Sequence, residues 1–127
     1  MHEGYAEVEM AQLLPGTVDF LVLKALAQGP RHGYDVARWV RETTHGVLAL
    51  EEGALYTALH RMERRKWLRP EWGVSENNRR AKYYSLSAKG RSQLEAQSRD
   101  WAEYARAIRR VLKAEDASSS SPAGGAA

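Results

Sequence analysis

The sequence contains no cysteine among its 127 residues. Disulfide frameworks and thiolate chemistry are therefore excluded. No stretch approaches the roughly 18 consecutive apolar residues that a membrane-spanning helix needs. Residues 2–12 carry several glutamates and lack the apolar run of a secretory signal. We therefore expect a soluble, cytoplasmic protein with no membrane partner.

The motifs of common enzyme active sites are also missing. The sequence has neither a glycine-rich phosphate loop nor a nucleophile elbow. Glu51-Glu52 looks like helix N-terminal charge that favours the helix dipole, rather than a paired acid and base. No spacing typical of metal ligands links the histidines, which are His2, His32, His45 and His60. The sequence predicts no catalytic residue, no metal site and no cofactor, and therefore a protein that is not an enzyme.

Positive charge is concentrated in one part of the chain. The whole chain has a net charge of only +3. Between Ala54 and Arg91, ten cationic residues stand against three acidic ones, which gives this stretch +7 and leaves −4 for the remainder. A local basic field of this kind indicates a surface that binds a polyanion. An ordinary solvated face is the alternative, because charge runs alone are weak signals.

Helical periodicity predicts three helices in the first half of the chain. The first follows Thr17 as its N-cap, with apolar residues recurring over residues 18–26, and ends at the Gly29-Pro30 turn. The second covers about residues 33–44, and the third begins at residue 52 or 53 and ends near residue 66. We expect Trp39, Trp67 and Trp72 to be buried or half-buried packing residues.

The third helix separates an apolar face from a polar one. Leu55, Ala58, Leu59 and Met62 share one sector of the helical wheel. The polar side chains outside this sector are the candidate DNA-binding residues: Tyr56, Thr57, His60, Arg61 and Arg64. The hydroxyl and imidazole groups suit phosphates or base edges, and the arginines suit either guanine or phosphate. Taken alone, such a helix is most often only a surface helix.

After the third helix the pattern becomes extended. Residues 68–74 and 81–86 read as two strands around a polar, basic loop, residues 75–80. Arg79 and Arg80 in this loop would contact the DNA backbone or a minor groove, whereas Asn77 and Asn78 are first of all turn residues, with DNA contact as a secondary reading. Three helices followed by a hairpin predict a winged helix-turn-helix, mainly α with a small β-hairpin.

A long last helix is predicted from Ser87, its N-cap, over residues 88–113. About 26 residues span roughly 39 Å, more than a domain of this size needs for its own core. Near-heptad spacing predicts dimerisation through Leu94, Trp101, Ala105, Ile108 and Leu112. A helix projecting into solvent is the alternative. The predicted organisation is an extension (1–13), a DNA-binding domain (14–87), a dimerisation helix (88–113) and a disordered tail (114–127). Trp101 could also line a small-molecule pocket at the dimer seam, although simple packing is the commoner role.

Three sequence blocks resemble, in the right order, the signatures of PadR-type bacterial transcriptional regulators. They read LAQGPRHGYD (26–35), GALYTALHRME (53–63) and RRAKYYSLSAKG (79–90). The resemblance covers about residues 14–94. It implies a dimeric winged-helix repressor, sometimes released from DNA by a small aromatic or drug-like molecule. Independently, a dimer would place two reading helices about one DNA turn apart, which favours a near-palindromic operator.

The resemblance also places individual residues. Tyr56 matches the leucine-tyrosine step of the recognition helix, and Arg79, Arg80 and Lys82 match the basic wing, which adds Lys82 to the expected DNA contacts. Thr57 stands where many members have proline, and the single C-terminal helix resembles the short branch of the family. The competing hypothesis is a winged-helix module that binds other proteins.

Overall fold

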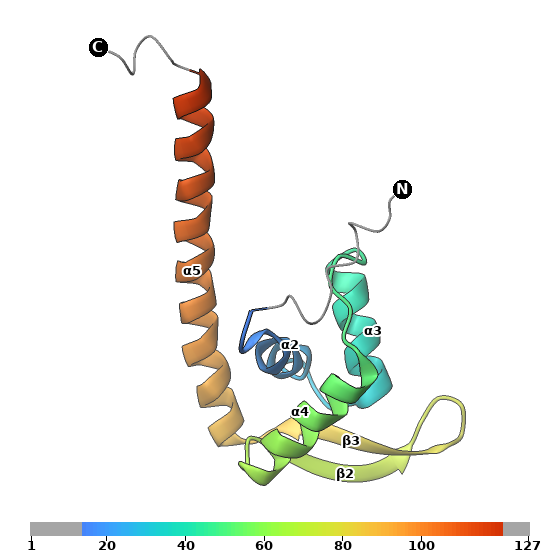
Figure 1. Cartoon of the computed structure of the whole chain (residues 1–127). Helices are drawn as coiled ribbons and strands as arrows, with labels where there is room; N and C mark the ends of the chain where they lie inside the picture. The colour runs from blue at the N-terminus through green and yellow to red at the C-terminus, as the bar shows by residue number, and fades with distance from the viewer. Residues whose placement is uncertain (1–13, 121–127) are drawn as a thin grey trace. The chain divides into compact units, whose positions relative to one another are not determined.

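A computed structural model describes residues 14–120 of the chain, with side chains placed as far as Ala114 (Figure 1). Its elements are α2 (Thr17–Ala25), β1 (Arg31–His32), α3 (Gly33–Thr43), α4 (Glu52–Arg64), β2 (Leu68–Val74), β3 (Arg80–Leu86) and α5 (Ala88–Ser120). The chain divides into two units after Leu94. The expected extension, residues 1–13, and residues 121–127 of the expected tail lie outside the described residues.

The first helix differs from the prediction at both of its ends. Gly16, not Thr17, occupies the N-cap, with φ of 89° in the left-handed region that glycine adopts without strain. Thr17 is the first residue of the helix, and its N–H donates to the carbonyl of Leu14 at 3.0 Å in the preceding turn. The helix ends at Ala25 and is followed by turns up to Gly29. Thr17 is buried and offers no side-chain cap.

The helices α3 and α4 form the helix-turn-helix. Each begins at a side-chain cap and ends at a residue with a left-handed backbone conformation. The Nδ1 atom of His32 accepts from the N–H of Asp35 at 3.2 Å at the start of α3. A carboxylate oxygen of Glu51 accepts from the N–H of Ala54 at 2.9 Å at the start of α4. Lys66, with φ of 69°, ends α4 through a Schellman pair of backbone hydrogen bonds. The predicted existence and approximate bounds of both helices are confirmed.

The sheet has three strands in the order β1-β3-β2, one more than the predicted hairpin. Arg31 and His32, expected in a turn, pair antiparallel with Tyr84 and Tyr83 of β3. A two-residue strand is too short to show the alternation by which strands are recognised in a sequence. Figure 1 shows the hairpin of β2 and β3 extending past α3 to its loop.

The hydrophobic core lies between α2, α3, α4 and the sheet. The predicted apolar face of α4 is confirmed as buried: Leu55, Ala58, Leu59 and Met62. Trp67 is buried and Trp39 packs partly buried against the core, but Trp72 is 56% exposed, so its expected burial is wrong. It lies in the outer part of the hairpin, where no described helix covers it.

The first turn of α5 is fixed to the domain. The N–H of Gly90 donates to the Oγ atom of Ser87 at 3.0 Å, which confirms Ser87 as the cap. The same hydroxyl donates to the carbonyls of Lys66 and Trp67 at 2.6 and 3.0 Å. Leu94, expected at a dimer seam, packs partly buried against this domain's own core.

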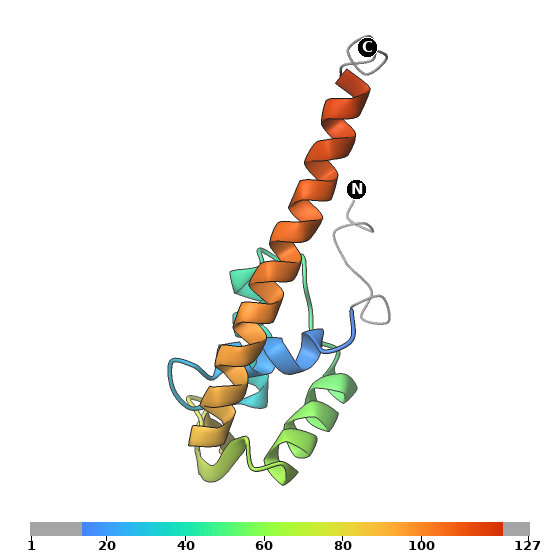
Figure 2. The ribbon, with the colours of Figure 1, turned by 90° about the vertical axis from the view of Figure 1, so that its left-hand side faces the viewer.

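Beyond Leu94, α5 continues as one uninterrupted helix (Figure 2). It ends at Ser120 rather than near Lys113, so the predicted tail begins too early; the side chains from residue 115 onward are not described. Large apolar side chains are exposed at Tyr104, Ile108, Val111 and Leu112. Tyr104 and Val111 extend the predicted stripe, because they stand three residues after Trp101 and Ile108, which is the spacing of the two apolar positions in a heptad. None of the helices, as far as the chain is described, has the length and apolarity to cross a bilayer.

Candidate nucleic-acid interface

The polar face of α4 projects from the domain as a ridge. Tyr56, Thr57, His60 and Arg64 are exposed, while the opposite face of the helix is buried in the core. A helix that carries its polar side chains on one free face can enter a major groove without disturbing its own packing. The separation of the two faces that the helical wheel predicts is therefore confirmed.

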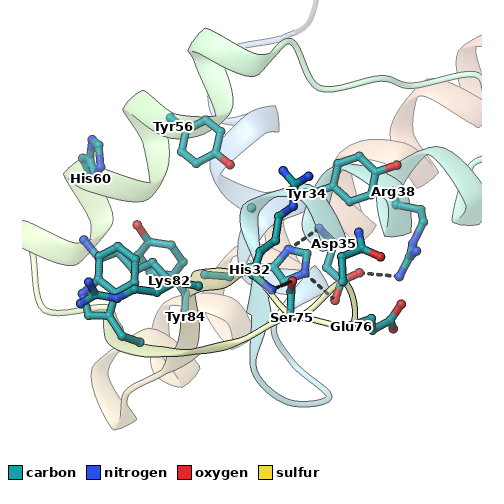
Figure 3. A pocket seen from close by; sticks show the side chains of 16 residues that line it. His32, Tyr34, Asp35, Arg38, Tyr56, His60, Ser75, Glu76, Lys82 and Tyr84 are labelled. Atoms are coloured by element: carbon teal, nitrogen blue, oxygen red, sulfur yellow. Dashed lines mark hydrogen bonds and ion pairs between the residues drawn. The ribbon is translucent and has the colours of Figure 1, made fainter.

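A hollow of about 590 Å³ separates one flank of α4 from the wing, which is the hairpin of β2 and β3 with the loop between them. Tyr56 and His60 line it from α4, and His32 and Tyr34 line it from the start of α3 (Figure 3). The side chains of Arg79 and Arg80 line it from the wing. With Lys82, which also lines the hollow, five of the predicted reading and wing residues thus border one concave surface.

Arg61 lies on the other flank of α4 and forms an ion pair within the domain. Its guanidinium is paired with the carboxylate of Asp19 in α2. Together with Thr57 it borders a second depression, on the α2 side. An arginine whose charge is balanced within the domain fixes the helix rather than offering a free cation. The structure therefore does not place Arg61 with the wing arginines.

Lys82 also forms an ion pair within the domain. Its ammonium lies 3.1 Å from a carboxylate oxygen of Glu63 in α4 and 5.5 Å from the centre of the Tyr84 ring. The hydrogen bond with Glu63 is the main cause that raises the pKa of Lys82 above its ordinary value. Burial raises the pKa of the neighbouring Tyr84 hydroxyl. Lys82 thus ties β3 to α4.

Backbone hydrogen bonds shape the tip of the wing. Asn78 has φ of 59°, the left-handed conformation expected of a turn asparagine, and its N–H donates to the carbonyl of Ser75 at 2.9 Å. The N–H of Ser75 donates to the carbonyl of Arg79 at 2.7 Å. Arg79 is exposed beyond this turn, so its side chain is presented by a defined loop.

Several of the residues that line the hollow were not predicted from the sequence as site residues. Tyr34, 65% exposed, and Arg38 come from α3, where Arg38 pairs with Asp35 at 2.5 Å. Trp72 lines the hollow from β2. Tyr34 stands inside the first block of the family resemblance, which was the available signal; Trp72 offers none besides its aromatic character. Across the described part of the chain, no cluster of three or more histidine, aspartate or glutamate side chains is placed to hold a metal ion.

Known proteins that resemble this chain are transcriptional regulators. Residues 22–96 match the model of the transcriptional regulator PadR-like family. A solved PadR family transcription regulator from Clostridium difficile is 30% identical, with a TM-score of 0.66 over 76% of this chain and 99% of that one. A transcriptional regulator from Clostridium thermocellum is 24% identical, with a TM-score of 0.69 over 81% and 97%.

A third solved structure contains DNA. PadR of Bacillus subtilis, in complex with operator DNA, is 19% identical with a TM-score of 0.56, over 67% of this chain and 46% of that one. At that identity the likeness concerns the fold. The family model covers more than half of this sequence, which confirms the resemblance that the three sequence blocks indicate. The chain belongs to the PadR-like family of transcriptional regulators, whose members are non-enzymatic DNA-binding proteins.

Proposed function

We propose that this protein is a cytoplasmic repressor that binds a near-palindromic operator as a homodimer. The observation that carries the proposal is the hollow that Tyr56 and His60 of α4 share with Arg79 and Arg80 of the wing. A ridge beside a cationic ribbon fits a major groove and its flanking backbone. The fold is also that of a PadR solved with operator DNA bound.

The exposed side chains divide by chemistry. Thr57, His60 and Arg64 contact base edges, because they stand on the exposed face of α4. Tyr56 hydrogen-bonds a phosphate. Arg79 and Arg80 contact the backbone or the minor groove beside the site. Two further residues, Arg61 and Lys82, hold α4 in place through their ion pairs, and Asn78 shapes the turn that presents Arg79.

Dimerisation through α5 accounts for its exposed apolar side chains. Trp101, Tyr104, Ile108 and Val111 follow heptad spacing, and Ala105 and Leu112 widen the same stripe. A second copy of the helix would cover this stripe. Two recognition helices then lie about one DNA turn, roughly 34 Å, apart, which favours a near-palindromic site.

A small aromatic or drug-like effector at the dimer interface completes the proposal. The rings of Trp101 and Tyr104 meet edge to face, with centroids 5.8 Å apart, and aromatic rings are common linings of ligand sites. A ligand that binds one dimer geometry better than another changes operator occupancy by that difference in affinity.

Selection of bound fragments from random DNA tests the proposal directly, because it yields both a motif and its half-site spacing. On the selected duplex, affinity should fall steeply as salt rises, since phosphate contacts release counterions. The Arg79→Ala and Arg80→Ala double variant should lose affinity for all sequences, whereas His60→Ala should alter sequence preference. A protein that shifts no fragment at low salt would instead be a protein-interaction module.

A further inference from the structure

Trp72 shares the α4 side of the sheet but lies beyond the part that the helix covers. In the register of β2 with β3, Trp72 is directly opposite Lys82. Residues directly opposite each other in an antiparallel pair project to the same face, and Lys82 bonds to Glu63 of α4 across that face. The indole therefore lies on the same side of the sheet as the recognition helix, where it remains 56% exposed.

Arg80 completes a two-part surface with Trp72. Its guanidinium carbon lies 4.4 Å from the centre of the indole ring, within the range of a cation–π contact. Among the side chains that the structure describes, no carboxylate forms an ion pair with Arg80. The result is an exposed indole ring with a guanidinium over it, and the cation–π contact holds the two side chains together.

The surroundings of this surface favour a polyanion. Trp72 and Arg80 line the same hollow as Tyr56 and His60 of α4. The acidic side chains in its lining are Asp35 and Glu76, and the charge of Asp35 is balanced by Arg38 at 2.5 Å. A DNA strand presents what the surface matches, namely the apolar C–H face of deoxyribose beside an anionic phosphate.

We propose that Trp72 and Arg80 together bind the sugar–phosphate backbone that flanks the bases contacted by α4. The indole packs on a deoxyribose, and the guanidinium pairs with the adjacent phosphate. This contact rests on the proposed function and adds to it a DNA-binding residue, Trp72, whose contribution does not depend on base sequence.

The test measures binding to a 30-base-pair duplex selected from random DNA by the wild-type protein, over a salt series. Trp72→Ala should lower affinity about three- to tenfold without changing the salt slope, because the indole is uncharged. Arg80→Ala should reduce the slope by about 0.9 for each phosphate that the guanidinium no longer neutralises. Val74→Ala is the matched control, since Val74 is similarly exposed on the same strand and should keep wild-type affinity within about twofold.

A hydroxyl-radical footprint locates the contact. Trp72→Ala should lose protection on the flanks of the site and retain it at the centre, and Trp72→Phe should restore part of both protection and affinity. Wild-type affinity and footprint for Trp72→Ala would overturn the proposal even if Arg80→Ala binds weakly. A wild-type protein that selects no duplex would instead overturn the proposed function itself.

Discussion

The ring of Tyr56 occupies the space that a side chain at Gly33 would need. A Cβ built on Gly33 would lie 2.5 Å from the Tyr56 hydroxyl oxygen and 2.8 Å from the ring carbon that bears it. Glycine at the start of α3 therefore lets the recognition helix place its tyrosine against the first turn of its neighbour. Figure 3 shows Tyr56 reaching from α4 toward α3.

Gly33→Ala should displace Tyr56 and weaken DNA binding about as much as Tyr56→Ala. Because the ring is half-exposed and can rotate away, the cost in folding stability should be only about 1 kcal/mol. A double-mutant cycle checks this, since Gly33→Ala should change little in the Tyr56→Ala background. Gly53→Ala is the control, because its new Cβ would meet only the Glu51 carboxylate at 3.4 Å. Additive effects on DNA affinity would contradict the coupling.

Removing the partner of Arg61 should reduce specificity while raising non-specific affinity. Asp19→Ala deletes a negative charge near the DNA, which favours any polyanion. It also frees the guanidinium that holds α4 against α2. The measurement is the ratio of affinities for the selected duplex and for a scrambled one. A ratio unchanged in Asp19→Ala would show that the ion pair does not position the recognition helix.

Gly90→Ala should destabilise the whole domain. The new Cβ would lie 2.2 Å from the carbonyl oxygen of Trp67, a backbone atom that cannot rotate aside. We expect a loss of about 2–3 kcal/mol in the free energy of unfolding, seen as a lower midpoint in urea. Ser92→Ala, at an exposed position of the same helix, should remain near wild type. Equal midpoints for the two variants would refute the close approach.

The Lys82–Glu63 pair predicts a loss of stability at alkaline pH. A pKa raised in the folded state means that the stabilisation is complete below the ordinary lysine value, about 10.4, and declines as pH rises through the folded value. Lys82→Met should cost about 0.5–1 kcal/mol at pH 7 and should flatten the decline above pH 10. A decline due to Tyr84 should persist in this variant, because burial raises the pKa of its hydroxyl.

Urea titrations from pH 7 to pH 11 measure this effect, with Lys89→Met, at an exposed lysine, as control. Curves for Lys82→Met and wild type that run parallel above pH 10 would exclude a contribution from the pair.

Truncating the stripe on α5 should separate the subunits. Trp101→Ala with Ile108→Ala removes two side chains one heptad apart, and monomers should appear by light scattering together with loss of operator binding. Glu103→Ala with Arg110→Ala has the same spacing on the opposite, charged side of the helix and should remain dimeric. A dimer mass retained by the first variant would place the seam elsewhere.

The helices and the two faces of α4 could be predicted because they depend on local periodicity. The apolar positions from Leu55 to Met62 repeat at helical spacing and need no knowledge of distant residues. The pairing of Arg61 with Asp19 joins residues 42 apart in sequence, and no local pattern identifies which of several acids an arginine will meet. Strand β1 escaped for a related reason, since its two residues become a strand only when β3 lies beside them.

The hydroxyl of Ser87 binds the carbonyls of both Lys66 and Trp67, the two residues that follow the last turn of α4. The start of α5 is thereby bonded to the residues at the end of α4. A rotation of one about its axis must turn the other or break these bonds. Any signal that reorients the first turn of α5 would thus either be passed directly to the end of α4 through these two hydrogen bonds or break them.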